Sequence, residues 1–205
     1  MRPWASITAA LFVFVCLAYL VTQGQADPFD AAIRASVHAW AWPLCTAIMR
    51  AITMLGSVYL LVPWAALVVW RWAATGRRRA AVFFAAASLS AEAAAQLLKV
   101  LFHRPRPDVF FGLLPAETYS FPSGHAFVPP VMFAMAAVIL AEGQKSPAAR
   151  IAIRWMALPM ALAIGFSRVY LGYHYPSDVL AGYALAIVWL AAVRSVWIDK
   201  ARKPE

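Results

Sequence analysis

The sequence has few charged side chains and almost no cysteine. Only 13% of its 205 residues are charged, and nine of these are acidic. A soluble domain carries roughly twice that share of charge, so the composition excludes an ordinary water-soluble globular protein. Cys16 and Cys45 lie far apart and form no CxxC pair. They indicate neither a disulfide framework nor a zinc knuckle.

Apolar residues, 63% of the chain, take the place of the missing charge. They recur in runs of about twenty residues, the length that crosses a bilayer. We predict an all-α, polytopic membrane protein: a single integral membrane domain over residues 1–205 with a six-transmembrane-helix bundle. The expected spans are residues 4–22, 57–74, 80–102, 123–141, 149–166 and 177–198. The first is longer than a signal-peptide core, so we expect a retained helix. Residues 28–55 predict two short interfacial helices, broken before Pro43.

Basic residues flank the spans, and their position explains the net charge of +9 better than a nucleic-acid partner does. They cluster at 77–79, 145–154 and 200–203, and cytoplasmic loops are the ones that collect lysine and arginine. We therefore predict an inner-membrane protein with cytoplasmic amino and carboxyl termini. The loops 103–122 and 167–176 then face the periplasm or exterior. No nucleic acid and no obligate protein partner is indicated.

The outward-facing ends nevertheless hold cations, which is the wrong side for them, and such exceptions usually have a function. Arginine offers a planar donor fork to phosphate oxygens, and lysine adds a point charge. The first N–H groups of the span that starts at residue 123 form a second anion-binding element. Together these parts predict a phosphoryl pocket, made of Lys99, Arg104, Arg106, Ser123, Gly124, His125, Arg168, His174 and Asp178.

Two histidines in this group bring chemistry to the pocket. One imidazole can attack phosphorus if a carboxylate orients it, and the other can donate a proton to the departing oxygen. Asp178 is the only acid close to a histidine, four residues after His174. Pro176 lies between them and is expected to begin the last span, so that Asp178 sits in its first turn.

Three motifs at these positions resemble those of the type 2 phosphatidic acid phosphatase (PAP2) superfamily. Lys99 to Pro107 resembles its K-x6-R-P motif, Pro122 to His125 its P-S-G-H motif, and Ser167 to Asp178 its S-R-x5-H-x3-D motif. All three are complete and in order, and the resemblance runs from the second span to the end. Three ordered matches arise by chance far more rarely than one.

The resemblance implies a membrane lipid phosphate or diphosphate phosphatase with a phosphohistidine intermediate and no metal or cofactor. By position, His174 is the nucleophile, Asp178 its orienting partner, and His125 the general acid that later serves as base. The implied phosphate ligands are Lys99, Arg106, Ser123, Gly124 and Arg168. The partners expected for such an enzyme are the bilayer and a membrane lipid phosphate.

The motifs do not identify the lipid that carries the phosphate. Undecaprenyl diphosphate is our first choice, because an outward site is where that carrier is released, and phosphatidylglycerophosphate is a related candidate. The superfamily also offers a lipid phosphotransferase or a lipid A 1-phosphatase. A non-catalytic anion-binding or transport protein would not need two histidines and an aspartate. The sequence has no HExxH motif, and a metal ion at these residues would lie among repelling cations. Both points count against a metal enzyme.

The sequence allows two interpretations of Arg104 and of Glu92. Arg104 lies outside the motif and faces either substrate or solvent. Glu92 is seven residues before Lys99, on nearly the same helical face. It is either functional, as ionisable groups in spans usually are, or a carboxylate that pairs with a base such as Arg154 or stays protonated. His103 and His38 are predicted to be structural.

Overall fold

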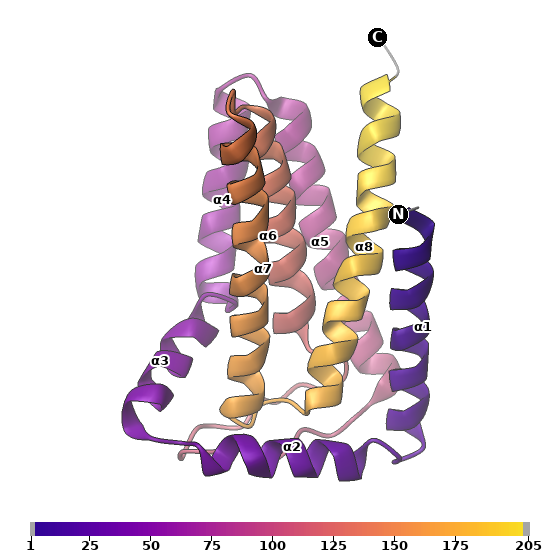
Figure 1. The fold of residues 1–205 in the computed structure, drawn as a ribbon, viewed down its shortest axis with the longest axis vertical. Coiled ribbons are helices and arrows are strands. Elements are labelled where there is room, and N and C mark those ends of the chain that lie inside the picture. The colour runs from indigo at the N-terminus through magenta and orange to yellow at the C-terminus, as the bar shows by residue number, and fades with distance from the viewer. Residues whose placement is uncertain (1–2, 203–205) are drawn as a thin grey trace.

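The structure is a computed structural model that describes residues 3–202 (Figure 1). In this range the chain forms eight helices and no strand. The helices are α1 (Pro3–Thr22), α2 (Asp27–Ala39), α3 (Pro43–Met54), α4 (Val58–Ala74), α5 (Arg78–Phe102), α6 (Gly124–Glu142), α7 (Pro147–Tyr170) and α8 (Pro176–Arg202).

Five of these helices, α1, α5, α6, α7 and α8, are long and apolar enough to cross a membrane. α4 has only 17 residues. It is long and apolar enough to cross a membrane only when α3 is added to it, across a bend of 43°. Each of the six predicted spans is thus a helix, and the all-α, multi-pass prediction is confirmed. The two short helices expected in residues 28–55 are α2 and α3, and α3 begins at Pro43 as predicted.

One boundary prediction is wrong in a way that matters for the site. The sequence placed the end of a span at residue 166, but α7 continues to Tyr170, so Ser167 and Arg168 lie in its last turn. The helix stops where Gly172 adopts a left-handed φ of +82°, a conformation that favours glycine and commonly ends helices. A Cβ at Gly172 would also lie 2.8 Å from the backbone nitrogen of Phe110. The loop between α7 and α8 is therefore only residues 171–175.

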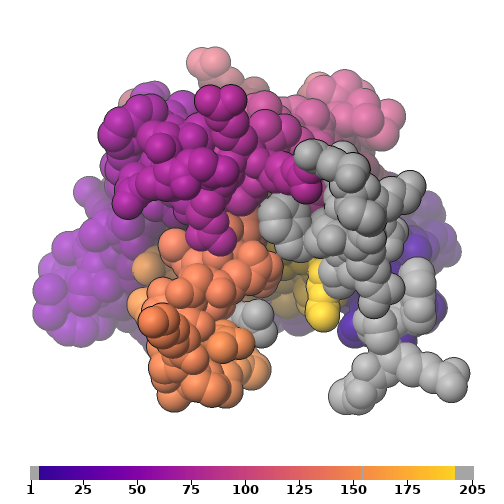
Figure 2. Space-filling view, turned by 90° about the horizontal axis from the view of Figure 1, so that it is seen from above, coloured from indigo at the N-terminus to yellow at the C-terminus, as the bar shows by residue number. Residues whose placement is uncertain are grey.

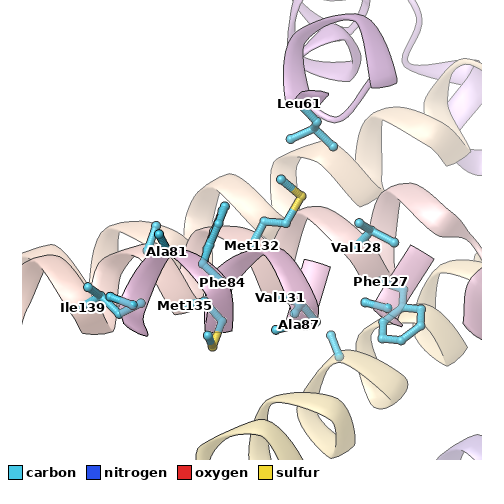
Figure 3. Close-up of a cluster of buried hydrophobic side chains, with 14 of the residues drawn as sticks. Leu61, Ala81, Phe84, Ala87, Phe127, Val128, Val131, Met132, Met135 and Ile139 are labelled. Carbon is cyan, nitrogen blue, oxygen red and sulfur yellow. The ribbon is translucent and has the colours of Figure 1, made fainter. Parts of the chain in front are cut away.

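α6 is the central helix and packs against α5, α7 and α8. Its side chains are buried on most sides, among them Phe127, Val131 and Ile139 (Figure 3). A helix that is apolar all round is expected in the middle of a membrane bundle. Pro129 and Pro130 interrupt it little, because packed neighbouring helices allow proline within spans.

Alanines bring α5 close to its neighbours. Its buried positions include Ala87, Ala91 and Ala95, and the next residue in this spacing is Lys99. Small residues four apart allow helix backbones to approach closely in a membrane. The same periodicity therefore carries the Lys99 ammonium to the packed face of α5, where it is buried.

The two ends of the bundle differ. α2 lies across one end, next to the segment that joins α5 to α6, whereas α1 starts and α8 ends toward the other (Figure 1). Seen from that second end, the α4–α5 and α6–α7 turns lie side by side (Figure 2). The Arg77 guanidinium, in the α4–α5 turn, donates to the carbonyl of Ile139 near the end of α6 at 3.1 Å. All the predicted site residues lie toward the α2 end.

Candidate active site

A cavity of about 500 Å³ opens between α4, α5 and α6. Six of the eight predicted catalytic and phosphate-binding residues line its polar end: Lys99, Arg106, Gly124, His125, Arg168 and His174. The other two, Ser123 and Asp178, lie behind them and are fully buried. The structure thus brings together residues from α5, the following loop, α6, α7 and the α7–α8 loop.

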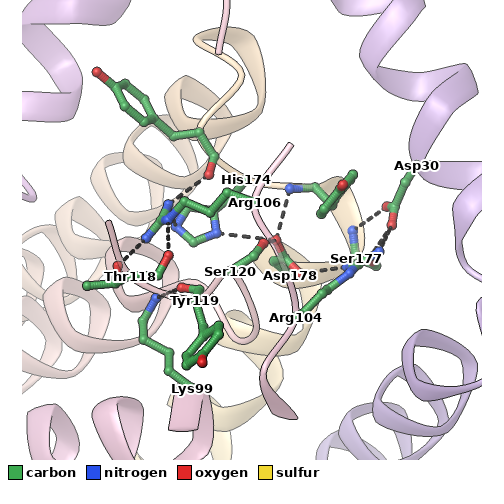
Figure 4. A network of polar contacts seen from close by, with 12 residues as sticks. Asp30, Lys99, Arg104, Arg106, Thr118, Tyr119, Ser120, His174, Ser177 and Asp178 are labelled. Carbon is green, nitrogen blue, oxygen red and sulfur yellow. Dashed lines mark hydrogen bonds and ion pairs between the residues drawn. The ribbon is translucent and has the colours of Figure 1, made fainter. Parts of the chain in front are cut away.

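His174 and Asp178 form the central pair of this site (Figure 4). Pro176 begins α8 as predicted, and Asp178 lies in its first turn. From there the carboxylate reaches back to the α7–α8 loop, where its Oδ2 lies 3.3 Å from His174 Nδ1. The same oxygen accepts the N–H of Tyr175 at 2.9 Å and the hydroxyl of Ser120.

The surrounding donors fix the tautomer of the His174 ring. Arg106 Nη1 lies 3.2 Å from His174 Nε2. Arginine has no acceptor atom, so Nε2 must accept with its lone pair and the proton must be on Nδ1, where it is donated to Asp178. The basic nitrogen of His174 therefore points to the cavity side, next to a cation.

Burial lowers the pKa of His174 well below its usual value, and the positive charges of Arg106, Lys99 and Arg168 lower it further. Both effects disfavour an added proton. The imidazole is consequently neutral near pH 7, which is the form that a nucleophile needs.

Three cations face the same space, and each has N–H groups left over for a ligand. Lys99 Nζ donates to the Tyr119 carbonyl at 2.7 Å, which uses one of its three hydrogens. Arg106 donates four of its five N–H hydrogens, to Thr118, Tyr173 and His174. Arg168 donates from Nη1 to the Thr53 hydroxyl at 2.8 Å, whereas its buried Nε has no partner among the described residues.

The amino terminus of α6 lies beside the cavity, where the sequence predicted an anion-binding element. Ser123 is the N-cap, and its backbone N–H donates to the Asp178 carbonyl at 3.0 Å. The first N–H groups of a helix have no partner within it, so those of Gly124 and His125 are open to an anion. Gly182 of α8 allows this packing, because a Cβ there would lie 2.7 Å from the Ser123 carbonyl oxygen.

His125 lies in the first turn of α6, and a glycine from another segment makes room for its ring. A Cβ on Gly56, between α3 and α4, would come within 2.9 Å of His125 Cδ2 and 2.6 Å of Ile164 Cγ2. Sequence reasoning missed this position, since a lone glycine before a span carries no motif.

Arg104 faces neither substrate nor solvent, which corrects both readings that the sequence left open. Its side chain is only 8% exposed and donates to Asp178 Oδ1 at 2.6 Å and to Asp30 Oδ2 at 2.7 Å (Figure 4). Ser177 completes the group by donating from its backbone N–H to Asp30 Oδ1 at 2.9 Å. Arg104 is thus buried behind the pair of His174 and Asp178.

Sequence reasoning also missed Asp30 and Ser120. Asp30 is the one fully buried residue of α2, which otherwise lies across the bundle end. The sequence held a signal for Asp30. It follows the first predicted span, so the predicted topology puts this acid on the same outer side as Arg104, whose role was open. Ser120 had no such signal, because it lies in an irregular loop two residues before the start of the P-S-G-H motif.

The remaining polar residues have simpler surroundings. Glu92 lines the cavity and accepts a hydrogen bond from Gln96 at 2.6 Å; the side chain of its alternative partner, Arg154, lies outside the described residues. The rings of His103 and Tyr119 pack edge to face with centroids 4.6 Å apart, and His38 stacks on Phe110 at 4.1 Å.

Comparison with known proteins identifies the family of this chain. The family model of the PAP2 superfamily matches residues 80–202, which include every predicted site residue. The chain belongs to the PAP2 superfamily. This PAP2 protein is 28% identical over 192 residues to phosphatidylglycerophosphatase B of Bacillus subtilis (strain 168), covering 90% of this chain and 92% of the relative. It is 28% identical over 169 residues to the putative undecaprenyl-diphosphatase YbjG of Escherichia coli (strain K12), covering 80% and 79%.

The fold has a close experimental counterpart. The crystal structure of a transmembrane PAP2 type phosphatidylglycerolphosphate phosphatase from Bacillus subtilis superposes with a TM-score of 0.87. The match covers 97% of this chain and 98% of the other, at 24% sequence identity. The PAP2 chain described here is therefore a multi-pass membrane protein with the same arrangement of helices.

Proposed function

We propose that this chain is a metal-independent lipid phosphatase that transfers a phosphoryl group first to His174 and then to water. The observation that carries the proposal is the orientation of the His174 ring. Its protonated nitrogen is held by Asp178, and its basic nitrogen faces a cavity lined by cations. Membership of the PAP2 superfamily and the names of its relatives support the same activity.

In the first step, the lone pair of His174 Nε2 attacks phosphorus and the bond from phosphorus to the lipid oxygen breaks. The bonding pair leaves with that oxygen, which takes a proton from the His125 ring. The phosphorylated His174 ring is now positively charged, and the Asp178 carboxylate stabilises this charge.

In the second step, water attacks the phosphohistidine and His125 accepts the proton that water loses. The bond between phosphorus and Nε2 breaks, its electron pair returns to the ring, and phosphate is released. Lys99, Arg168, the remaining N–H of Arg106 and the α6 amino terminus bind the non-bridging oxygens in both steps. Every proton and electron pair is accounted for without a metal-activated water.

The cavity provides a route for the lipid. Beyond its polar end, its walls are apolar and come from α4, α5 and α6, with Leu61, Val62, Leu89, Val128 and Met132 among them. A phosphorylated headgroup binds at the cations while the hydrocarbon tail follows these walls and leaves sideways into the bilayer. A substrate that stays in the membrane needs no aqueous entry route.

Phosphate release by purified protein in detergent tests the proposal. The panel contains undecaprenyl diphosphate, which we place first, phosphatidylglycerophosphate, phosphatidic acid, diacylglycerol pyrophosphate and a lipid A 1-phosphate. We expect release from at least one lipid, its abolition by His174→Ala, and its persistence in His103→Ala, whose ring lies outside the cavity. Binding of phosphate without turnover of any lipid would favour the anion-binding alternative. Transfer to an added acceptor lipid faster than to water would favour the phosphotransferase.

Chelation separates this mechanism from a metal enzyme. Asp178 already accepts hydrogen bonds at both carboxylate oxygens, and histidine supplies the nucleophile. We therefore expect full activity in excess EDTA and competitive inhibition by orthovanadate, which adopts a five-coordinate geometry like that of the transition state. Loss of activity in EDTA, with recovery on adding a divalent ion, would favour the metal reading.

We further propose that the site faces the periplasm or exterior and both termini the cytoplasm. The basic turns near residues 77–79 and 145–150 lie at the end of the bundle opposite the site, as the rule for cytoplasmic loops predicts. Single Glu117→Cys and Ser146→Cys variants, in a background without Cys16 and Cys45, test this with an impermeant maleimide on intact cells. Both positions are exposed. Labelling at 117 only is expected, and labelling at 146 only would reverse the topology.

A further inference from the structure

Arg104 lies between two buried carboxylates, one of them the catalytic Asp178 (Figure 4). Its Nη1 donates to Asp178 Oδ1 at 2.6 Å and to the Ser177 hydroxyl at 2.8 Å, and its Nη2 donates to Asp30 Oδ2 at 2.7 Å. Ser177 in turn donates its hydroxyl to Asp30 at 2.6 Å. The loop after α5, the start of α8 and α2 therefore meet in one closed hydrogen-bond network.

The donors around both carboxylates favour the ionised form of each. Asp30 accepts from Ser177 N–H, Ser177 hydroxyl and Arg104, and Asp178 accepts from Arg104, Ser120 and the Tyr175 N–H. Every one of these partners supplies a hydrogen, and a carboxylate that only accepts carries its charge. Burial lowers the pKa of Arg104, but Asp178 and Asp30 outweigh burial and raise it overall, so the guanidinium is charged as well.

The charges of this group match what the reaction needs. Two carboxylates and one guanidinium leave one net negative charge next to a neutral His174. Formation of the phosphohistidine adds one positive charge to the ring, and the buried group then becomes neutral. If Arg104 had Asp178 as its only partner, that pair would already be neutral and would attract the imidazolium less strongly.

We propose that Arg104 and Asp30 are positioning residues for phosphoryl transfer to His174. Arg104 holds Asp178 Oδ1, so that Oδ2 is turned to the His174 ring. Asp30 shares the Arg104 charge, so that the Asp178 charge remains available to the imidazolium. This inference rests on the proposed function, because it assigns both residues an effect on the same chemical step.

The two residues act without touching the ligand. Neither Arg104 nor Asp30 lines the cavity, so their loss should slow the chemical step and leave phosphate binding unchanged. Partners that orient a catalytic group from behind typically contribute about 10- to 100-fold to activity. We expect kcat of Asp30→Asn to fall by that factor, with KM and the Ki of inorganic phosphate within about twofold of wild type.

α2 offers a matched control for this experiment. Asp27 lies 3.5 Å from Arg104 Nη2, but its side chain is 71% exposed, against 1% for Asp30. Exposed ion pairs contribute little, so Asp27→Asn should have wild-type kcat. Arg104→Lys keeps a charge but not the planar fork, and it should retain more activity than Arg104→Gln.

The outcomes separate the two proposals. Equal kcat for Asp30→Asn and Asp27→Asn, or a loss confined to KM and Ki, overturns the positioning role. If Asp30→Asn is not monodisperse in detergent, Arg104→Lys decides: lowered kcat with unchanged Ki supports the role, and wild-type kcat overturns it. Turnover by His174→Ala instead overturns the proposed function itself. An inactive His174→Ala beside fully active Asp30 and Arg104 variants removes only this inference.

Discussion

Replacing Asp178 with asparagine removes one charge from the site and turns one of its two acceptor oxygens into a donor. The amide keeps the size of the side chain and one acceptor oxygen, while the negative charge that faces His174 disappears. In the structure Asp178 Oδ2 lies 3.3 Å from His174 Nδ1, and both side chains are buried. The phosphohistidine would then form its positive charge next to a neutral group and near three cations.

The magnitude follows from that distance. Two unit charges 3.3 Å apart interact by about 5 kcal/mol at an effective dielectric constant of about 20. Each 1.36 kcal/mol changes a rate about tenfold. Loss of the charge should therefore lower kcat by about 10³- to 10⁴-fold, which is also the size of effect known for the aspartate of a Ser-His-Asp triad.

The assay is phosphate release from the best lipid of the panel, with Asp178→Asn and wild type in the same detergent. Size-exclusion behaviour and Tm verify that the variant is folded, and the Ki of inorganic phosphate verifies that the cations still bind. The expected result is a large loss in kcat with a small change in Ki. A folded variant with kcat within tenfold of wild type would refute the reasoning, because Asp178 would then not stabilise the charge on His174.

Further predictions concern the neighbours of this pair. His125→Ala should slow hydrolysis of monophosphate lipids more than of diphosphate lipids, whose leaving group needs a proton less; equal losses would contradict the general-acid role. The acid limb of kcat/KM, which reports the free enzyme, should lie below pH 6.5, because activity is lost as pH falls through the lowered pKa of His174. Arg106→Gln removes a cation and should move this limb to higher pH on the same substrate; an unmoved limb would contradict the assignment. Gly56→Ala should lower kcat at least severalfold by displacing His125, and wild-type kcat would show that the ring position is not critical.

Much of the fold was predictable from the sequence because hydropathy and membrane thickness constrain it directly. The spans are long apolar runs, and in each the structure has a helix. The burial of Lys99 also follows from a local pattern, the four-residue spacing of Ala87, Ala91 and Ala95. Six of the eight predicted catalytic and phosphate-binding residues line one cavity, because they lie at or beside the helix ends that face α2.

The parts that could not be predicted depend on contacts between distant segments. Arg104 meets Asp30 across 74 residues of sequence, and neither residue belongs to a motif. Gly56 is needed because His125 and Ile164 approach it from two other helices. The extension of α7 to Tyr170 depends on the left-handed turn at Gly172, which packs against the segment at Phe110. No local periodicity encodes such contacts.

The central claim is that His174 carries the phosphoryl group, and trapping that intermediate tests it most directly. Purified protein is mixed with a lipid substrate labelled with ³²P at the scissile phosphate, quenched in base within milliseconds, digested and mapped. The account predicts a label that is stable to base and labile to acid, on the peptide containing His174, and absent from His174→Ala. A label on another residue, or full turnover with no labelled protein at any quench time, would contradict it.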